Sequence, residues 1–132
     1  MIYSLLILPS PDAGASVARA HAFARAVLAA GHSIHRVFFL GDGAAAGNAL
    51  AVFPQDENNP VEAWAALGEE QGLDLVLCIS SALRRGQLDA GEAKRYDRPG
   101  TSVHPAFTVS GLGQLVDACD SSDRVITFGG SA

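Results

Sequence analysis

The chain has 132 residues, of which 48% are hydrophobic and only 17% are charged. A chain of this length can bury enough apolar surface for a stable core without disulfides or a structural metal. Nine basic residues stand against fourteen acidic ones, which gives a net charge of −5. Proteins that grip a phosphate backbone usually present a basic face, so direct nucleic-acid binding is not expected. No apolar run reaches the roughly 18 residues that a transmembrane helix needs, so no membrane segment is expected either.

The first residues, MIYSLLILPSPDAG, lack the basic start and the small-residue cleavage site of a secretory signal. The chain has two cysteines, Cys78 and Cys119. Few cysteines and no export signal together predict a reduced, cytoplasmic location.

Five apolar segments read as strands. The first, IYSLLIL, is a continuous apolar run closed by Pro9, as is typical of a strand covered on both faces. The predicted strands span 2–8, 34–40, 73–79, 106–109 and 124–128.

Helices are predicted between these strands. Apolar residues recur at helical spacing after Ser16, which we expect to be an N-cap, and Gly31 ends that helix. Asn59-Pro60 predicts another helix start, and Gly72 its end. Further helical segments are predicted from about residue 44, at 80–86 with Ser80 and Ser81 as caps, at 90–96, and at 111–119 with Ser110 as cap.

Strands that alternate with helices favour parallel pairing through right-handed crossovers. We therefore predict a single three-layer α/β/α domain over residues 1–128, with a five-stranded parallel sheet and a loose tail at 129–132. In such sheets, ligands and chemistry collect beyond the carboxyl ends of the strands. Cys78 lies next to last in its predicted strand, so the fold itself brings it to that edge.

The glycine-rich loop GDGAAAG, residues 41–47, follows a strand and precedes a helical segment. Its spacing differs from the dinucleotide-binding fingerprint, and Asp42 would place a carboxylate where a pyrophosphate should rest. A structural turn is favoured, and nucleotide binding is the alternative.

Metal and acid–base sites are not evident. The four histidines, at positions 21, 32, 35 and 104, form no metal-binding spacing with each other or with the cysteines, and we interpret them as structural or surface residues. No serine-nucleophile elbow or catalytic carboxylate pair occurs. No metal or organic cofactor is expected.

The two cysteines differ in their settings. Leu112, Leu115, Val116 and Cys119 share one helical face, which predicts that Cys119 is buried and inert. Cys78 sits where a strand ends and a helix begins. The amides and positive dipole end of that helix would favour a thiolate there, and two arginines follow within two turns. A core role for Cys78 stays open beside this reactive one.

Several segments resemble the TusD/DsrE family of small sulfurtransferase subunits. The most specific is LVLCISSALRRG, and the second is FTVSGLGQLVDACDSSDRVITFG. The resemblance extends over residues 2–128.

This resemblance implies a sulfurtransferase with Cys78 as the catalytic residue. Cys78 would take sulfane sulfur as a persulfide from a TusA-like donor and pass it to a TusE-like acceptor, for 2-thiouridine at the tRNA wobble position. TusB- and TusC-like subunits would complete a heterohexamer. The alternatives are DsrE-like sulfur trafficking in sulfur oxidation and a non-catalytic assembly subunit.

Three residues are candidates for supporting roles: Arg84, Arg85 and Ser80. The arginines would stabilise the thiolate or orient a partner, or else simply end a solvated helix. Charge is also uneven along the chain, with seven acids and no Lys or Arg between Asp42 and Asp74, and five bases between Arg84 and Arg98. Two solvated faces, or a surface that orients charged protein partners, would both explain it.

Overall fold

The computed structural model describes residues 1–129, and these contain one five-stranded sheet. Every strand pair is parallel, and the spatial order is β4-β3-β2-β1-β5. The strands are β1 (Ile2–Ile7), β2 (Ser33–Phe39), β3 (Leu75–Cys78), β4 (Phe107–Ser110) and β5 (Arg124–Phe128). The five predicted strands and their parallel pairing are confirmed.

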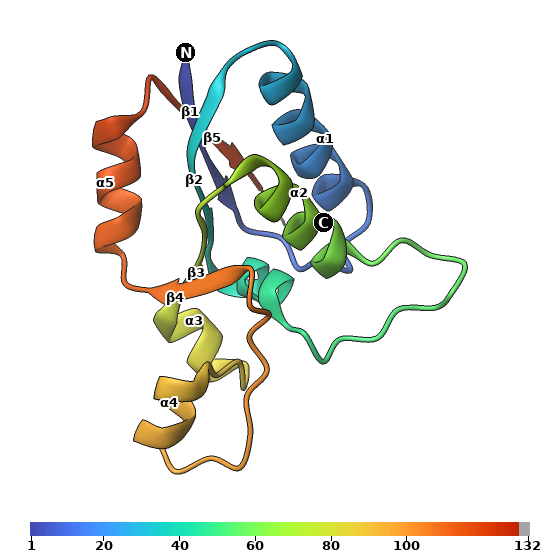
Figure 1. Cartoon of the computed structure of the whole chain (residues 1–132), viewed down its shortest axis with the longest axis vertical. Coiled ribbons are helices and arrows are strands. Elements are labelled where there is room, and N and C mark those ends of the chain that lie inside the picture. The colour runs from blue at the N-terminus through green and yellow to red at the C-terminus, as the bar shows by residue number, and fades with distance from the viewer. Residues whose placement is uncertain (130–132) are drawn as a thin grey trace.

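Helices cover both faces of this sheet. The helices are α1 (Ala15–Ala29), the 3-10 helix η1 (Gly41–Gly47), α2 (Pro60–Gln71), α3 (Ile79–Arg84), α4 (Ala90–Arg95) and α5 (Gly113–Ser121). In Figure 1, α1 and α2 lie on one side of the sheet and α5 on the other, while α3 and α4 extend below it. The predicted three-layer α/β/α architecture is therefore confirmed.

The main core lies between the sheet and the α1/α2 layer. Trp64 of α2 is fully buried and meets the ring of Phe39 edge-on, with the centroids 5.5 Å apart. Phe39 in turn packs against Phe107 of β4 at 5.6 Å. Leu5, Leu75 and other apolar side chains fill the space around these rings, so this face is closed and hydrophobic.

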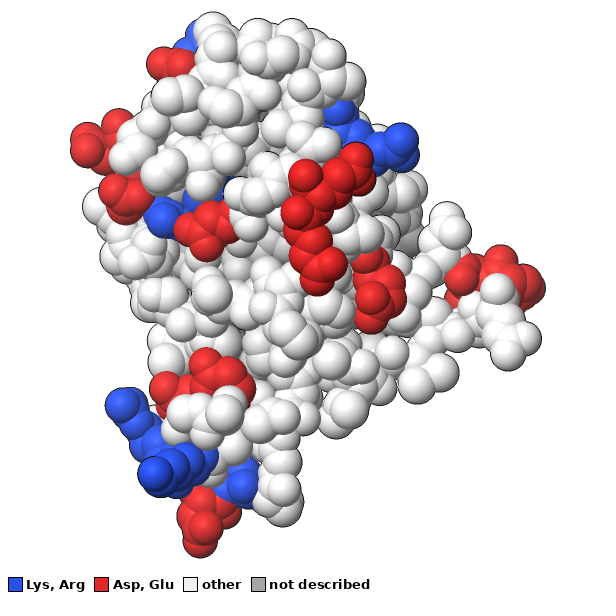
Figure 2. Space-filling view, viewed as in Figure 1, with Lys and Arg blue, Asp and Glu red and all other residues white. Residues whose placement is uncertain are grey.

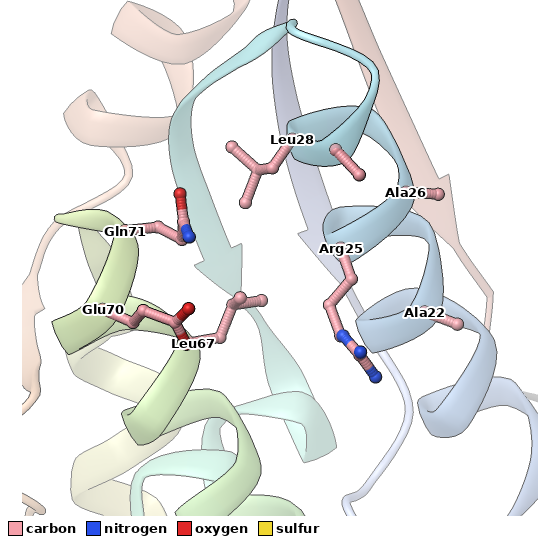
Figure 3. A pocket seen from close by; sticks show the side chains of 8 residues that line it. Ala22, Arg25, Ala26, Leu28, Leu67, Glu70 and Gln71 are labelled. Carbon is pink, nitrogen blue, oxygen red and sulfur yellow. The ribbon is translucent and has the colours of Figure 1, made fainter.

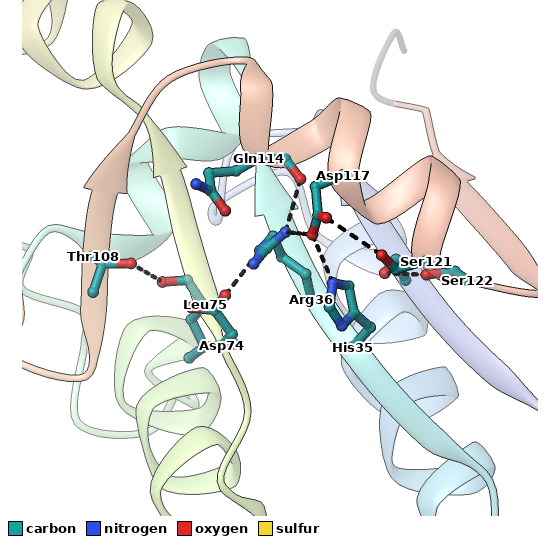
Figure 4. Close-up of polar contacts among 10 residues, drawn as sticks. His35, Arg36, Asp74, Leu75, Thr108, Gln114, Asp117, Ser121 and Ser122 are labelled. Carbon is teal, nitrogen blue, oxygen red and sulfur yellow. Dashed lines mark hydrogen bonds and ion pairs between the residues drawn. The ribbon is translucent and has the colours of Figure 1, made fainter.

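The opposite face carries α5 and a buried arginine. Arg36 of β2 donates hydrogen bonds to the carboxylates of Asp74 and Asp117, both at 2.8 Å, and to the backbone oxygen of Gln114 at 2.9 Å (Figure 4). His35 also bonds to Asp117, at 2.9 Å. Because Gln114 and Asp117 belong to α5, this network fastens that helix to β2.

The predicted ends of α2 were confirmed. The Asn59 side chain accepts hydrogen bonds from the amides of Val61 and Glu62, and Gly72 ends α2 in the left-handed conformation, both as expected.

The prediction that serines cap the starts of α1, α3 and α5 was wrong. Gly14, Cys78 and Leu112 occupy the N-cap positions of α1, α3 and α5, and none of them makes a side-chain capping bond. The predicted tail at 129–132 lies outside the described residues from position 130 onward.

Close packing explains two of the three glycines of the 41–47 loop. A Cβ at Gly43 would collide with the backbone oxygen of Ile7, and one at Gly47 would collide with the side chain of Leu77. The loop forms η1 against the sheet. Packing therefore accounts for Gly43 and Gly47, while Gly41 has a φ of 61°, in the left-handed region that favours glycine.

Within residues 1–129, no helix combines the length and the apolar character that crossing a membrane requires.

Candidate active site at the carboxyl end of β3

Cys78 is the last residue of β3 and the N-cap of α3. Its backbone is extended, with φ −60° and ψ 123°, and the chain turns into the helix directly after it. In a parallel sheet this position is the edge where binding and catalytic groups gather. The location predicted for Cys78 is thus the one that the structure shows.

Two serines surround the Cys78 thiol with polar contacts. Its Sγ lies 3.5 Å from the hydroxyl oxygen of Ser80, which is exposed. Burial alone would raise the pKa of the Cys78 thiol. Hydrogen bonds from the side chains and backbone amides of Ser80 and Ser81 outweigh that effect and lower the pKa below its ordinary value. The site therefore favours the thiolate, which is the nucleophilic form of cysteine.

An apolar cluster covers the rest of Cys78. The residue is only 2% exposed and packs with Phe38 and Val76, and Leu115 of α5 lies against this cluster. Alternation along β3 directs Val76 and Cys78 to the same face of the sheet, the one that α5 covers. Leu6 and Leu40 pack against the same cluster, so α5 is one part of the cover over the thiol.

Arg85 is engaged in holding the η1 turn. Its guanidinium donates to the Asp42 carboxylate at 2.7 Å and to the Ser81 backbone oxygen at 3.1 Å. The Ser81 hydroxyl also accepts a hydrogen bond from the Gly41 amide at 2.9 Å. These contacts join α3 to η1, so Arg85 and Ser81 fix the helix that follows Cys78. Sequence reasoning assigned Ser81 a capping role and missed this one, because its partner Gly41 is distant along the chain.

Arg84 and Ser80 lie differently. Arg84 is exposed, and within residues 1–129 no hydrogen bond or ion pair joins either arginine to Cys78. Of the three candidate supporting residues, only Ser80 contacts the thiol.

The prediction that Cys119 is buried was wrong. Both cysteines are free thiols, but Cys119 is exposed, and so are Leu112 and Val116 on the same stripe of α5. The side of α5 that meets the sheet instead carries Asp117 and the fully buried Ala118. Any labelling of Cys78 must therefore account for Cys119.

We also searched the described residues for a metal site and for a second pocket with reactive side chains. Across the described part of the chain, no three His, Cys, Asp or Glu side chains are grouped to hold a metal. An open groove runs between α1 and α2, and its lining combines alanines and leucines with the polar side chains of Arg25, Glu70 and Gln71 (Figure 3). It lies on the face of the sheet opposite Cys78 and contains no nucleophile.

The protein is thus a parallel α/β domain with a hydrogen-bonded thiol at the end of the interior strand β3, an arrangement suited to thiol chemistry. Residues 1–128 match the DsrE/DsrF-like family, and the chain belongs to that family.

Named relatives of similar length match this chain over nearly its whole length. The chain is 45% identical to the "Sulfurtransferase TusD homolog" of Pseudomonas aeruginosa, with 98% of each chain covered. It is 38% identical to "Sulfurtransferase TusD" of Serratia proteamaculans, over 97% of this chain and all of the other. It is also 43% identical to the DsrE protein of Allochromatium vinosum, over 98% and 99% of the two chains. The predicted family and the sulfurtransferase class are confirmed.

The fold has a solved counterpart. The crystal structure of the YchN protein from Escherichia coli superposes with a TM-score of 0.71, covering 97% of this chain and 99% of that one. At 18% identity this likeness concerns the fold alone.

Proposed function

We propose that this chain is a sulfur carrier that accepts sulfane sulfur as a persulfide on Cys78 and passes it to another protein. The observation that carries the proposal is the Cys78 thiol, which ends the interior strand β3, contacts the Ser80 hydroxyl and has a lowered pKa. The confirmed family supports the same assignment.

The transfer needs no redox partner. The Cys78 thiolate attacks the outer sulfur of a donor persulfide, R–S–SH, and the donor's sulfur–sulfur bond breaks. The donor leaves as a thiolate that takes up a proton, and Cys78 becomes Cys–S–SH. Transfer onward repeats the exchange with an acceptor thiolate, and Cys78 returns as the leaving group.

In the relay we propose, a TusA-like protein is the donor and a TusE-like protein is the acceptor, in the cytoplasm. TusB- and TusC-like subunits complete a heterohexamer, and the sulfur ends in 2-thiouridine at the tRNA wobble position. Full-length similarity to chains named TusD supports this route. The 43% identity to a DsrE protein supports an alternative, in which the sulfur serves sulfur oxidation.

Intact mass spectrometry tests the persulfide step. A Cys119→Ser variant incubated with a persulfide donor should gain about 32 Da, the mass of one sulfur atom. A Cys78→Ser variant that retains Cys119 is the matched comparison. If the adduct forms on that variant and not on the Cys119→Ser variant, Cys78 is not the acceptor.

Complementation separates the two routes. The gene is expressed in a strain that lacks its own TusD-type subunit, and tRNA nucleosides are then analysed. Restored 2-thiouridine supports the tRNA route. Its continued absence, alongside a persulfide on Cys78 in vitro, would favour sulfur oxidation.

The burial of Cys78 specifically favours a second candidate, an assembly subunit in which the residue only fills the core. Alkylation of the Cys119→Ser variant distinguishes them. A carrier should be alkylated at Cys78 in the native state, whereas an assembly subunit should be alkylated only after denaturation.

A further inference from the structure

Charge divides this molecule into two unlike parts. We call residues 79–104, which comprise α3, α4 and the segment that returns to β4, the basic lobe. It carries five bases against three acids, while the rest of the chain carries four bases against eleven acids. In Figure 1 the lobe extends below the sheet, and in Figure 2 a cluster of Lys and Arg side chains marks its lower-left end.

Four of the five bases are free to meet a partner. Arg85 is held by Asp42, but Arg84, Lys94, Arg95 and Arg98 are exposed. Within residues 1–129, none of these four has a carboxylate oxygen within 4.0 Å. Tyr96 lies among them and is 47% exposed. Arginine and tyrosine are the residues that most often dominate binding energy at protein interfaces.

Contacts at both ends of the lobe tie it to the body: Arg85 and Ser81 of the lobe meet η1, and its last residues meet Gly47 and Ala49. Within the lobe, the Ser102 hydroxyl donates to the Gly86 backbone oxygen at 2.8 Å and accepts from the Leu88 amide at 3.2 Å. The Ser102 backbone oxygen accepts from the Ala49 amide at 2.7 Å. A surface held in this way loses little conformational freedom when a partner binds.

The lobe also adjoins the candidate active site. Its first helix, α3, starts at the residue after Cys78. At about 1.5 Å per helical residue, Arg84 lies about 9 Å along that helix. A macromolecule that brings a reactive sulfur to Cys78 must therefore come close to Arg84, the first base of the lobe.

We propose that the basic lobe is the docking surface for an acidic protein, which presents its sulfur-bearing cysteine to Cys78. This inference rests on the proposed function. Positive charge beside the thiol accelerates encounter with an acidic surface and repels basic ones. A nucleic acid fits less well, because Asp89, Glu92 and Asp97 interrupt the run of bases and the whole chain is acidic.

Model peptides test the docking step. Three synthetic peptides each carry one cysteine as a 2-thiopyridyl disulfide, flanked by Glu, Gln or Lys. Attack by the Cys78 thiolate joins it to the peptide sulfur and releases thiopyridone, whose absorbance gives the rate. The Cys119→Ser background confines the reaction to Cys78.

The ratio of the Glu-peptide rate to the Gln-peptide rate is the decisive quantity. It should be about tenfold at low salt and fall towards one at about 0.5 M salt, with the Lys peptide slowest. The double variant Lys94→Glu/Arg95→Glu should abolish this ratio. The control Arg19→Glu/Arg25→Glu reverses two exposed charges on α1 and should keep it. An equal loss in both variants, or none in either, would overturn the docking surface.

A non-covalent measurement separates this proposal from the sulfur-carrier function. The Glu peptide with its cysteine replaced by serine is titrated into isotope-labelled protein, and amide shifts should concentrate in residues 84–98. Shifts there without any reaction at Cys78 would support docking while contradicting the carrier function. Absent shifts, or a tighter complex of a stem-loop RNA with the same residues, would overturn the assignment to an acidic protein.

Discussion

The two faces of the sheet are built in different ways. The face under α1 and α2 is closed by buried aromatic and aliphatic side chains, including Trp64 and Phe39. The face under α5 holds a smaller apolar cluster beside a buried arginine, and only a nine-residue helix covers it. Cys78 belongs to this second face.

We expect one face of the sheet to determine the stability of the fold and the other to determine the reactivity of Cys78. Burial of large apolar side chains supplies most of the free energy of folding, so the α1/α2 face should determine whether the chain folds. The α5 face is fastened by one polar network and a half-buried leucine, Leu115. Segments held by few contacts open transiently more often than well-packed ones. Such opening of α5 would expose the buried Cys78 thiol to a reagent.

The largest expected effect is on folding. Leu75→Ala, in the main core, should lower the free energy of unfolding by about 2–5 kcal/mol because it leaves a cavity. Leu112→Ala makes the same chemical change on α5 at a side chain that is 55% exposed, and should cost less than about 0.5 kcal/mol. Urea denaturation measures both. Equal losses would show that the two faces contribute alike.

The next effect concerns access to the thiol. Leu115→Ala in the Cys119→Ser background should cost about 1–2 kcal/mol and increase the rate of iodoacetamide labelling at Cys78 several-fold. Leu112→Ala in the same background is the control, and its labelling rate should match the parent. If Leu115→Ala left the rate unchanged, α5 would not limit access.

Acid should loosen the attachment of α5. Hydrogen bonds from His35 and Arg36 lower the pKa of Asp117 to about 2. Because the pKa in the folded state lies below the unfolded value near 3.9, this carboxylate stabilises the fold above about pH 4 and progressively less as the pH falls towards 2.

Asp117→Asn should therefore be less stable than the parent at pH 7, and the gap should narrow towards pH 2. Asp120→Asn removes an exposed carboxylate of the same helix and should change little. Urea midpoints measured between pH 2.5 and 7 would contradict this role for Asp117 if both variants gave the same pH dependence.

The smallest effect is on the thiol itself. Ser80→Ala removes the hydroxyl beside Sγ, so the pKa of Cys78 should rise towards its ordinary value. The midpoint of the pH–rate profile for alkylation should then move to higher pH, with little change in stability. Ser110→Ala alters the residue paired with Cys78 on β4, which makes no hydrogen bond to Sγ within the described residues, and should leave the midpoint in place.

Much of the fold was predictable because its signals are local. Continuous apolar runs mark strands covered on both faces, and their alternation with helices leaves parallel pairing as the consistent topology. Asn59 and Gly72 bound α2 through contacts within a few residues of chain. The same alternation brings Cys78 to the carboxyl edge of the sheet. For these features, the information lies in neighbouring residues.

The orientation of α5 was decided by tertiary structure. Its apolar stripe suggested that Leu112, Val116 and Cys119 face inward, yet all three are exposed. The sheet surface beneath α5 presents Arg36, whose charge must be paired when it is buried, and Asp117 supplies that pairing. Ala118 is small enough to lie flat against the strands.

The sequence by itself thus determined the parallel α/β architecture and the strand-end position of Cys78, because both follow from local periodicity. Only the tertiary structure decided which side of α5 is buried, that Arg85 pairs with Asp42, and that Leu115 packs against the cluster that contains Cys78. Each of these depends on residues far apart in the chain that meet only after the sheet has formed. A pattern within one helix cannot specify the chemistry of the surface against which it packs.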